Sequence, residues 1–520
     1  MPDPRAIDLS ETRSEEGYFL LREHVERPFH HRADDSDGWR FCCTYRDSAP
    51  TLRDAVFELI RNAKQKVFIT SFIVGDDELI ELLAQTARRL LGGVYVISGL
   101  TETSLQRGLA EIADREDISQ KVEAEKKRFI SLTNQGVAVR GHENCHAKFL
   151  VVDDAVAWVG SANLETRAFT RVGEVGVVLN HQPSVSRLAR LFARMWLTDC
   201  KYELPAFGDG YRVAVRKEFP QIRFKVADPE LDGEAALVWT DDLDTPSRGD
   251  ATDPRRASLL HSVQDVIDRA RRRLVLASFN LNRMQENPQL VLDLVTAAVA
   301  RGVKVELLVR ALNDRDRHRR DAGLFHDMGV EVLADDSNHA KAAIADDQHG
   351  VLFSANFDGD HGLLAGTGIE VGTRLDGTPA MADLTAYFQH ALSCATRTYT
   401  PQPTAHQLAR GLSVMPPWPL DAEIGIECDW QAWLQFHQSA CQRPVTWVRG
   451  KAKSIELAAG DRSFLLRPNG SSYQLLPEST PGGGDAIMRL VREAQRGGGR
   501  LQDRGVCTAV FRYTGIHSPR

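Results

Sequence analysis

Hydrophobic residues follow two periodicities that alternate along the first part of the chain. Apolar positions recur with helical spacing over 52–63, and the run 66–74 that follows is mostly apolar, as a buried strand requires. A second amphipathic stretch, 78–91, ends at two glycines before the strand-like run 94–97. This order of helix, strand, helix and strand predicts an α/β unit with a largely parallel sheet.

The same order returns in the second part of the chain. Helical spacing covers 257–270 and 290–300, and each stretch is followed by a strand-like run, at 273–278 and 303–309. We therefore expect an α/β fold made of two α/β/α sandwich halves that lie side by side.

Other segments differ in composition from these halves. Residues 101–136 read as a charged helical insertion, for which a solvated lid-like hairpin is favoured over a substrate-binding arm. Short strand-like runs and a helix over 485–495 predict a small α+β module near the C-terminus, which is a candidate site for a protein partner. The predicted organisation is a polar N-terminal extension (1–45), a first half (46–205), a connecting segment (206–255), a second half (256–400) and a C-terminal α+β module of unknown role (405–520).

Composition limits the classes of partner and location. The 520 residues include 64 Lys and Arg against 71 Asp and Glu, a formal net charge of -7, so any attraction to nucleic acid or to an anionic membrane must be local. The chain opens without a positively charged segment followed by an apolar run, and it has no uninterrupted apolar window of about 18 residues, which predicts a cytoplasmic protein. Eight cysteines without a CxxC pair or metal-ligand spacing predict reduced thiols, and we expect no metal or cofactor.

A repeated set of polar residues supplies the candidate chemistry. The first copy runs from His146 to Asn163, and the second copy runs over the same distance from His339 to Asn356. Such a repeat would arise by chance with a probability of roughly one in several thousand. The paired residues are His146 with His339, Lys148 with Lys341, Asp153 with Asp346, Ser161 with Ser354, and Asn163 with Asn356.

The local pattern explains how these residues could meet a substrate. Residues 148–152 read as a strand, Asp153 and Asp154 as a tight turn, and 155–159 as the returning strand. Residues two apart on a strand share a face, so His146 and Lys148 point the same way. An imidazole, a fixed cation and neutral hydrogen-bonding groups on one face suit a phosphate diester.

With these motifs the chain resembles the phospholipase D superfamily, which carries HxKxxxxD followed by GSxN twice in each active site. The resemblance covers about residues 45–400. It implies two halves that share one active site and metal-independent cleavage of phosphodiesters through a phosphohistidine, and it favours His146 as the nucleophile. It also fits a later glutamate in each half, Glu174 and Glu370, which would hold and polarise the histidines.

Two features of the motifs leave room for other interpretations. The motif aspartates, Asp153 and Asp346, fall in predicted turns, where a structural role competes with a catalytic one. The motif glycine is Gly160 in the first copy but Phe353 in the second. This departure bears on how closely the second half follows the backbone of the family.

A cluster of arginines directly follows the strand predicted over 303–309. Ligands of α/β folds usually bind at the carboxyl ends of strands, and arginine binds phosphate bidentately, so these arginines are candidate substrate-binding residues. A surface loop whose aspartates offset the charge is the alternative interpretation. The candidates are Arg315, Arg317, Arg319 and Arg320.

Three functions remain open at this point. A cytoplasmic nuclease that cleaves DNA or RNA is favoured by the arginine cluster and by the added C-terminal module. A phospholipase D or a phosphatidyltransferase similar to cardiolipin synthase, acting on phospholipid, is the alternative because both motifs lie in one chain. An inactive binding scaffold is the least favoured, since both HxK pairs are intact.

Overall fold

The computed structural model describes most of the chain up to residue 404 and several strands beyond it. The described residues are 16–31, 38–46, 48, 51–101, 103–106, 118–206, 211–217, 236–240, 250–254, 256–404, 407 and 411, and the backbone of 6–8, 422–428, 455–459, 462–469, 472–476 and 509–516.

The chain divides into two compact units. The larger unit is made of His24–Leu312 and Leu324–Ala395, and the smaller one of Met1–Glu23, Asn313–Gly323 and Thr396–Arg520. Both copies of the repeated motif lie in the larger unit.

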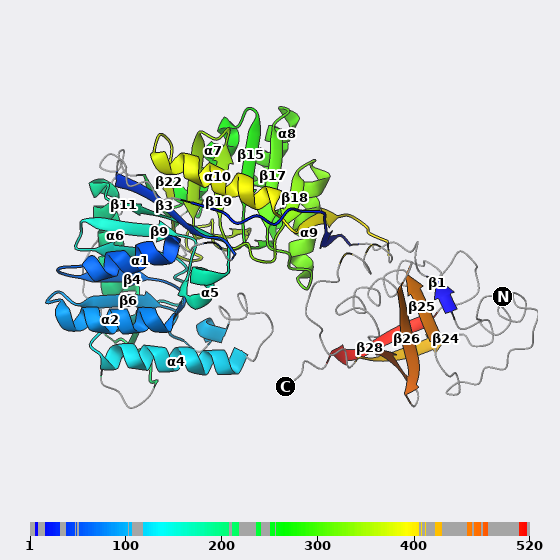
Figure 1. Ribbon diagram of the computed structural model, residues 1–520, viewed down its shortest axis with the longest axis horizontal. Coiled ribbons are helices and arrows are strands. Elements are labelled where there is room, and N and C mark those ends of the chain that lie inside the picture. The colour runs from blue at the N-terminus through cyan, green and yellow to red at the C-terminus, as the bar shows by residue number, and fades with distance from the viewer. Residues whose placement is uncertain are drawn as a thin grey trace, which may run out of the picture. The chain divides into compact units, whose positions relative to one another are not determined.

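The first half of the larger unit is built on a nine-stranded sheet (Figure 1). Its strands are β3 (Trp39–Thr44), β4 (Val67–Thr70), β6 (Val94–Ser98), β7 (Ala138–Gly141), β8 (Phe149–Val152), β9 (Val156–Gly160), β11 (Glu174–Leu179), β12 (Tyr202–Leu204) and β13 (Ala214–Val215), and β5 (Val74–Gly75) pairs separately with β10 (Leu164–Glu165). Its helices are α1 (Thr51–Asn62), α2 (Asp77–Arg89), α4 (Ile118–Asn134), α5 (Thr166–Thr170) and α6 (Gln182–Arg194), followed by η2 (Met195–Asp199). The strand order is β13-β12-β7-β6-β4-β8-β9-β11-β3, with β7, β6 and β4 parallel.

The second half repeats this architecture. Its strands are β14 (Leu237–Thr240), β15 (Arg273–Ala277), β17 (Lys304–Val309), β18 (Glu331–Ala334), β19 (Ala342–Ala345), β20 (His349–Phe353) and β22 (Glu370–Arg374), and β16 (Leu281–Asn282) pairs with β21 (Phe357–Asp358). Its helices are α7 (Ser258–Arg269), α8 (Leu292–Ala300), α9 (Asp316–Asp327) and α10 (Pro379–Ser393), with short turns η3 (Met284–Glu286) and η4 (Pro288–Leu290). Within the larger unit the order is β14-β22-β20-β19-β15-β17-β18, which matches the seven strands of the first half from β3 to β7, in the order β3-β11-β9-β8-β4-β6-β7.

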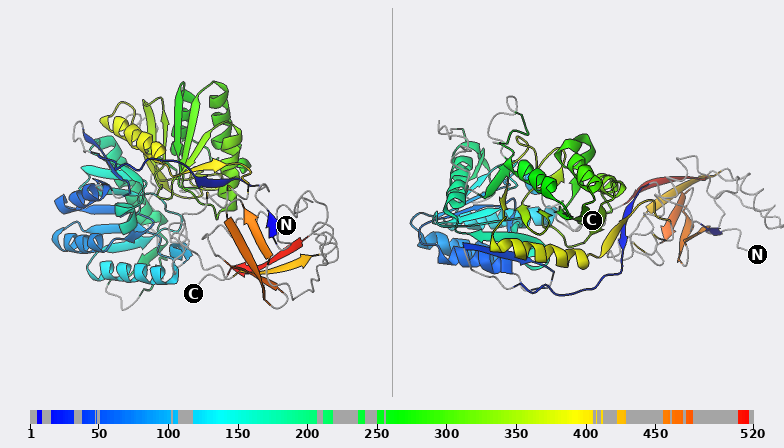
Figure 2. Two further views of the ribbon diagram at one scale, coloured as in Figure 1. Left: turned by 45° about the vertical axis from the view of Figure 1, so that its right-hand side comes forward. Right: turned by 90° about the horizontal axis from the view of Figure 1, so that it is seen from above.

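The predicted α/β fold with two halves is therefore what the chain forms. The two sheets share one hydrophobic core, which contains Leu188 of α6, Leu384 and Phe388 of α10, and Val159 and Leu352 of the two hairpins. Helix α10 of the second half packs against strand β3 of the first (Figure 2). Because the core runs through both halves, the two copies of the motif are held in one body.

Three segments differ from the sequence prediction because they form parts of the two halves. Residues 39–44 were assigned to a polar extension, yet as β3 they pair with all of β11 and bury Phe41 and Cys43. The connecting segment likewise contributes β14, which pairs with β22. Helix α4 is no lid-like insertion: it links β6 to the parallel strand β7 and buries Val122, Phe129 and Leu132.

The replacement of the motif glycine leaves the backbone of the second hairpin unchanged. Gly160 N donates to Lys148 O at 3.2 Å, and Phe353 N donates to Lys341 O at 3.2 Å. In the first half a Cβ at Gly160 would lie 2.5 Å from the indole of Trp158. Val351 stands at the position of Trp158 in the second hairpin, so the buried aromatic ring has moved two residues along the strand.

The smaller unit contains a six-stranded sheet, β1-β25-β26-β27-β24-β28. Its strands are β1 (Ala6–Asp8), β24 (Ala422–Cys428), β25 (Ile455–Ala459), β26 (Arg462–Asn469), β27 (Ser472–Leu476) and β28 (Ala509–Ile516), and an antiparallel ladder joins β2 (Tyr18–Leu21) to β23 (Arg397–Thr400). The predicted C-terminal module thus includes a strand from the N-terminus, β1, which runs parallel to β25. The helix predicted over 485–495 lies outside the described residues.

None of the helices within the described ranges combines the length and the apolar character needed to cross a membrane.

Candidate active site

The two HxK segments meet through short parallel bridges between the halves. His146 N donates to Ile369 O at 3.0 Å, and His339 N donates to Gly173 O at 2.9 Å. Ile369 and Gly173 directly precede the glutamates at the start of β22 and β11. Each histidine is therefore fixed beside the glutamate of the other half.

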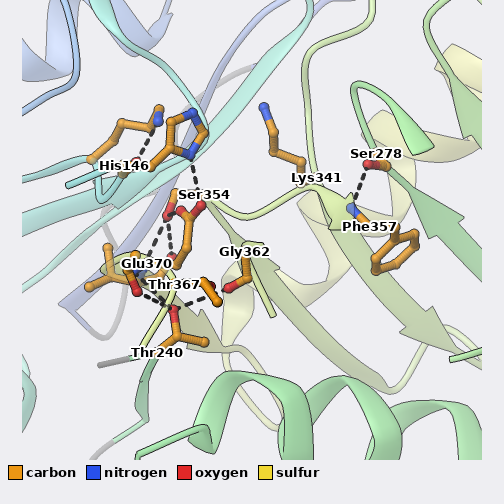
Figure 3. A network of polar contacts seen from close by, with 12 residues as sticks. His146, Thr240, Ser278, Lys341, Ser354, Phe357, Gly362, Thr367 and Glu370 are labelled. Carbon is orange, nitrogen blue, oxygen red and sulfur yellow. Dashed lines mark hydrogen bonds and ion pairs between the residues drawn. The ribbon is translucent and has the colours of Figure 1, made fainter. Parts of the chain in front are cut away.

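The side chains complete this crosswise pairing. His146 Nδ1 lies 2.8 Å from Glu370 Oε1, and His339 Nδ1 lies 2.6 Å from Glu174 Oε1. The second oxygen of each glutamate accepts a hydrogen bond from the motif serine of its own half: Ser161 Oγ donates to Glu174 Oε2 at 2.5 Å, and Ser354 Oγ donates to Glu370 Oε2 (Figure 3). The structure thus brings together the histidines, the serines and both glutamates.

The two lysines are buried against their own histidines. Lys148 Nζ donates to His146 O at 2.5 Å, and Lys341 Nζ donates to His339 O at 2.7 Å. Lys341 Nζ also lies 3.1 Å from His339 Nδ1 and 3.3 Å from its Nε2. Both lysines have no exposed surface, so two positive charges are held inside the site.

The motif asparagines follow directly after the hairpins. The carboxamide oxygens of Asn163 and Asn356 are buried and, among the described residues, accept no hydrogen bond. A buried amide left without partners normally costs stability, so these two groups are suited to contact a substrate.

The two glutamates have opposite pKa shifts. Burial raises the pKa of Glu174 to about 7, although the charge of Lys341 opposes this. Burial acts on Glu370 as well, but the charge of His146 and its hydrogen bond outweigh it and lower the pKa of Glu370. Burial, followed by the charge of Lys341, also lowers the pKa of His339 well below its ordinary value.

These shifts make the two pairs chemically unequal. The Glu370 carboxylate is ionised near neutral pH and accepts a hydrogen bond from the Nδ1–H group of His146. Glu174 keeps its proton up to a pH of about 7 and shares it with His339. His146 is also the more open of the two, with 23 % of its side chain exposed against 6 % for His339.

Several residues that support the site were missed in the sequence. Ser71 and Ser278 each accept a backbone hydrogen bond just after the motif asparagines, from Leu164 N at 3.1 Å and Phe357 N at 3.0 Å. The ring of the next residue, Phe72 or Phe279, lies 5.9 Å from the ring of His146 or 4.8 Å from that of His339. The signal was present as a Ser-Phe pair directly after β4 in the first half and directly after β15 in the second.

A threonine in each edge strand stands opposite a glutamate. Thr240 Oγ accepts from Glu370 N at 3.1 Å and donates to Gly362 O at 3.1 Å (Figure 3). Thr44 pairs with Glu174 in the same register of the first sheet. Because these threonines lie outside the two predicted halves, in the predicted extension and connecting segment, the sequence pattern did not indicate them.

The motif aspartates lie at the opposite end of the hairpins from the histidines. Asp153 accepts backbone hydrogen bonds from Lys64, Gln65 and Lys66 at 2.7–2.9 Å. Asp346 does the same for Arg271, Arg272 and Arg273 at 2.8–2.9 Å. The interpretation of Asp153 and Asp346 as catalytic is corrected: both fix the turn of the hairpin to the strand beside it.

The arginine candidates are corrected in part. Arg319 is buried in the smaller unit, where its guanidinium donates to Glu16, to Asp316 and to the carbonyl of Asn313 and lies 4.6 Å from the ring centre of Tyr18. Because both terminal nitrogens of the guanidinium are held by these bonds and the side chain is buried, Arg319 serves the fold rather than a phosphate. The side chain of Arg320 is 67 % exposed, and its Nε lies 3.8 Å from Glu16 Oε1. Arg317 is exposed and Arg315 is half-buried. Arg317, Arg319 and Arg320 lie on helix α9 rather than in a loop.

Comparisons with known proteins agree with this architecture. A family described as "Cardiolipin synthase, PLD-like domain" matches residues 56–196 and 263–392, which is just over half of the chain and includes both hairpins. A protein from Bos taurus named 5'-3' exonuclease PLD3 is 29% identical over 189 residues, covering 34% of this chain and 36% of that protein. Cardiolipin synthase 1 from Bacillus anthracis is 27% identical over 145 residues, covering 27% of this chain and 26% of that protein.

Among solved structures, phosphatidylserine synthase of Haemophilus influenzae covers 71% of this chain and 89% of its own at 14% identity, with a TM-score of 0.47. The matched region of this chain spans only about a quarter to two fifths of the length of the curated relatives named above and their neighbours.

Proposed function

The chain belongs to the phospholipase D superfamily, and on that premise we propose that it is a phosphodiesterase that works through a phosphohistidine and acts on nucleic acid. The single observation that carries the chemistry is the crosswise pairing of His146 with Glu370 and His339 with Glu174. Two imidazoles whose partner glutamates have opposite pKa shifts, held in one body with two buried lysines, are what a two-step phosphoryl transfer needs.

In the first step His146 attacks phosphorus. His146 Nδ1–H donates a hydrogen bond to the ionised Glu370. The lone pair on Nε2 of His146 is therefore available to attack phosphorus. The N–P bond forms while the bond from phosphorus to the leaving oxygen breaks, and the proton held by the Glu174 and His339 pair passes to that oxygen. Lys148 and Lys341 offset the charge that develops on the phosphoryl oxygens.

The second step reverses the proton flow. Water, or the hydroxyl of an acceptor alcohol, attacks the phosphohistidine and gives its proton to the pair of His339 and Glu174. The N–P bond breaks, and His146 is regenerated. This assignment agrees with the weak preference for His146 as the nucleophile that the family resemblance gave.

Nucleic acid is supported over phospholipid by the surface of the protein. In the described ranges the large apolar residues that are exposed are Val25, Leu91 and Val215, which are scattered along the chain rather than gathered at the motifs. A lipid enzyme that docks on a membrane surface gathers apolar side chains where it meets the lipid, and the described residues show no such patch beside the motifs. The relative named as an exonuclease supports the same choice.

Phosphatidyl transfer is the second candidate. It is supported by the description of the matching family and by the cardiolipin synthase relatives. An inactive scaffold has less support. Phe353 keeps the backbone hydrogen bond that Gly160 makes in the first half, and both histidines contact their glutamates.

The test is a parallel cleavage assay of the purified full chain in EDTA. Single- and double-stranded DNA and RNA and mixed phospholipid vesicles serve as substrates. The His146→Asn variant is the blank, and His349→Asn, which alters a histidine at the turn end of β20, is the matched control. We expect nucleic acid to be cleaved by the wild type and by His349→Asn but not by His146→Asn. Release of phosphatidic acid with intact nucleic acid would overturn the substrate, and a requirement for added metal would overturn the chemistry.

A further inference from the structure

The two halves of the active site differ at one corresponding position. In the first half Gly99 follows β6, and its N donates to Phe72 O at 3.3 Å. In the second half Arg310 follows β17, and its N donates to Phe279 O at 3.1 Å. The backbone frames match, so the difference is a side chain: none in one half and a guanidinium in the other.

Arg310 lies on the same side of the site as His339, the proposed general acid. Its guanidinium carbon lies 5.5 Å from the centre of the Phe279 ring, and that ring lies 4.8 Å from the ring of His339. The guanidinium and the imidazole are therefore within about 10 Å of each other. Arg310 is only 6 % exposed, and its positive charge contributes to the low pKa of His339.

The buried positive charge of Arg310 makes the two sides of a nearly symmetric site electrostatically different. Lys148 and Lys341 are related by the repeat and serve the scissile phosphate from both sides. Arg310 has no counterpart in the first half, so its field favours a second anionic group on the His339 side alone. His339 protonates the leaving oxygen in the proposed mechanism, and the second anion must therefore belong to the leaving fragment.

We infer that Arg310 is a substrate-binding residue that recognises the phosphate next to the scissile one on the leaving side, and so sets the direction in which a nucleic-acid strand binds. This inference rests on the proposed function. A nucleic-acid strand has a phosphate at every linkage, whereas a phosphatidyl head group such as glycerol leaves without one. Arg310 is thus a determinant of substrate class as well as of direction.

The experiment uses short single-stranded oligonucleotides with one cleavable linkage. In one, the neighbouring linkage on the leaving side is a neutral methylphosphonate; in another, the neutral linkage is on the retained side; the parent keeps both charges. The ratio of kcat/KM between parent and neutral substrate is measured for the wild type, Arg310→Ala, Arg310→Lys and the control Arg272→Ala, an exposed arginine of the same half. A one-phosphate substrate, bis(p-nitrophenyl) phosphate, reports whether the wild type has the proposed activity at all.

We expect the wild type and Arg272→Ala to lose roughly tenfold or more when the leaving-side phosphate is neutral, as a charge-assisted hydrogen bond implies. Arg310→Ala should show a ratio near one on that side and the wild-type ratio on the retained side. Arg310→Lys, which keeps the charge without the planar fork, should restore part of the discrimination.

Several outcomes would overturn the inference while leaving the function intact. The first is a wild-type kcat/KM that does not change when the leaving-side phosphate is neutral. The second is an Arg310→Ala variant with the same parent-to-neutral ratio of kcat/KM as the wild type. The third is an equal loss of kcat/KM for the neutral linkage on either side. If Arg310→Ala does not fold, as judged by thermal unfolding, Arg310→Lys decides alone: its leaving-side ratio must fall below that of the wild type. A wild type that cleaves neither the oligonucleotides nor bis(p-nitrophenyl) phosphate would instead refute the proposed function.

Discussion

At the scale of single residues, two chemically identical pairs are given different properties by their surroundings. Glu174 and Glu370 each contact a histidine and a serine in the same geometry. Burial outweighs the neighbouring charges at Glu174 and raises its pKa, whereas the charge and the hydrogen bond of His146 outweigh burial at Glu370 and lower its pKa, so the proton is retained on Glu174 to a higher pH than on Glu370. The proposed division of labour between nucleophile and acid rests on this difference.

A prediction for Glu174 follows from the sign of its pKa shift. Its pKa is raised to about 7, so the proton is present below that pH and is lost as the pH rises through it. If this proton protonates the leaving group, kcat/KM should fall above pH 7. Glu174→Gln should remove this alkaline limb and lower kcat by roughly 10²–10⁴. The pH–rate profile of a substrate with a poor leaving group is the measurement.

Glu165 offers a matched control for that experiment. Burial raises its pKa to about 7 as well, but within the described residues it forms no hydrogen bond to either histidine. Glu165→Gln should therefore keep the alkaline limb. Loss of the limb in Glu165→Gln, or its survival in Glu174→Gln, would contradict the assignment of Glu174.

At the scale of elements, the two hairpins show how a motif can tolerate a substitution. Both turn residues of each hairpin have positive φ, 57° and 54° at Asp153 and Asp154 and 53° and 61° at Asp346 and Asp347, as a tight two-residue turn requires. The anchored turns hold the strands in the same register, and one buried aromatic ring fills the space beside each strand. Trp158 supplies it in the first hairpin and Phe353 in the second.

This exchange predicts a measurable coupling in stability. Gly160→Phe should destabilise the fold, because a Cβ at Gly160 lies 2.5 Å from the Trp158 ring and 2.7 Å from Val175 O, and overpacking typically costs about 1–3 kcal/mol. The double variant Trp158→Val with Gly160→Phe copies the second hairpin and should recover part of that loss. Urea unfolding of the single and double variants measures the coupling, and strictly additive effects would refute the exchange.

At the scale of the whole molecule, the sequence predicted local order better than long-range pairing. The two halves, their hairpins and the His, Lys, Ser and Asn positions could be predicted, because periodicity and an internal repeat encode them locally. The edge strand β3 could not, since its sequence Trp-Arg-Phe-Cys-Cys-Thr shows no strict alternation and its buried run is only four residues long. The partner of each histidine could not either: 224 residues separate His146 from Glu370, and 165 separate His339 from Glu174.

Arg310 illustrates the same limit at the site. Arg310 lies at the start of the arginine-rich stretch after β17. The substrate-binding residues predicted in that stretch were Arg315, Arg317, Arg319 and Arg320. What distinguishes Arg310 is its contact with the Phe279 ring beside His339 and the glycine at its counterpart. Both facts require the two halves to be superposed, which composition and spacing do not do.

The most direct test of the whole account is to trap and locate the covalent intermediate. His339→Asn is mixed with a p-nitrophenyl phosphodiester, whose leaving group needs no general acid, and the protein is mapped by mass spectrometry. We expect a burst of about one p-nitrophenolate per active site and a phosphoryl adduct on His146, because the residue that activates water is missing. The adduct should be absent from His146→Asn. Unimpeded turnover by His339→Asn, or an adduct that forms as well without His146, would contradict the two-histidine mechanism.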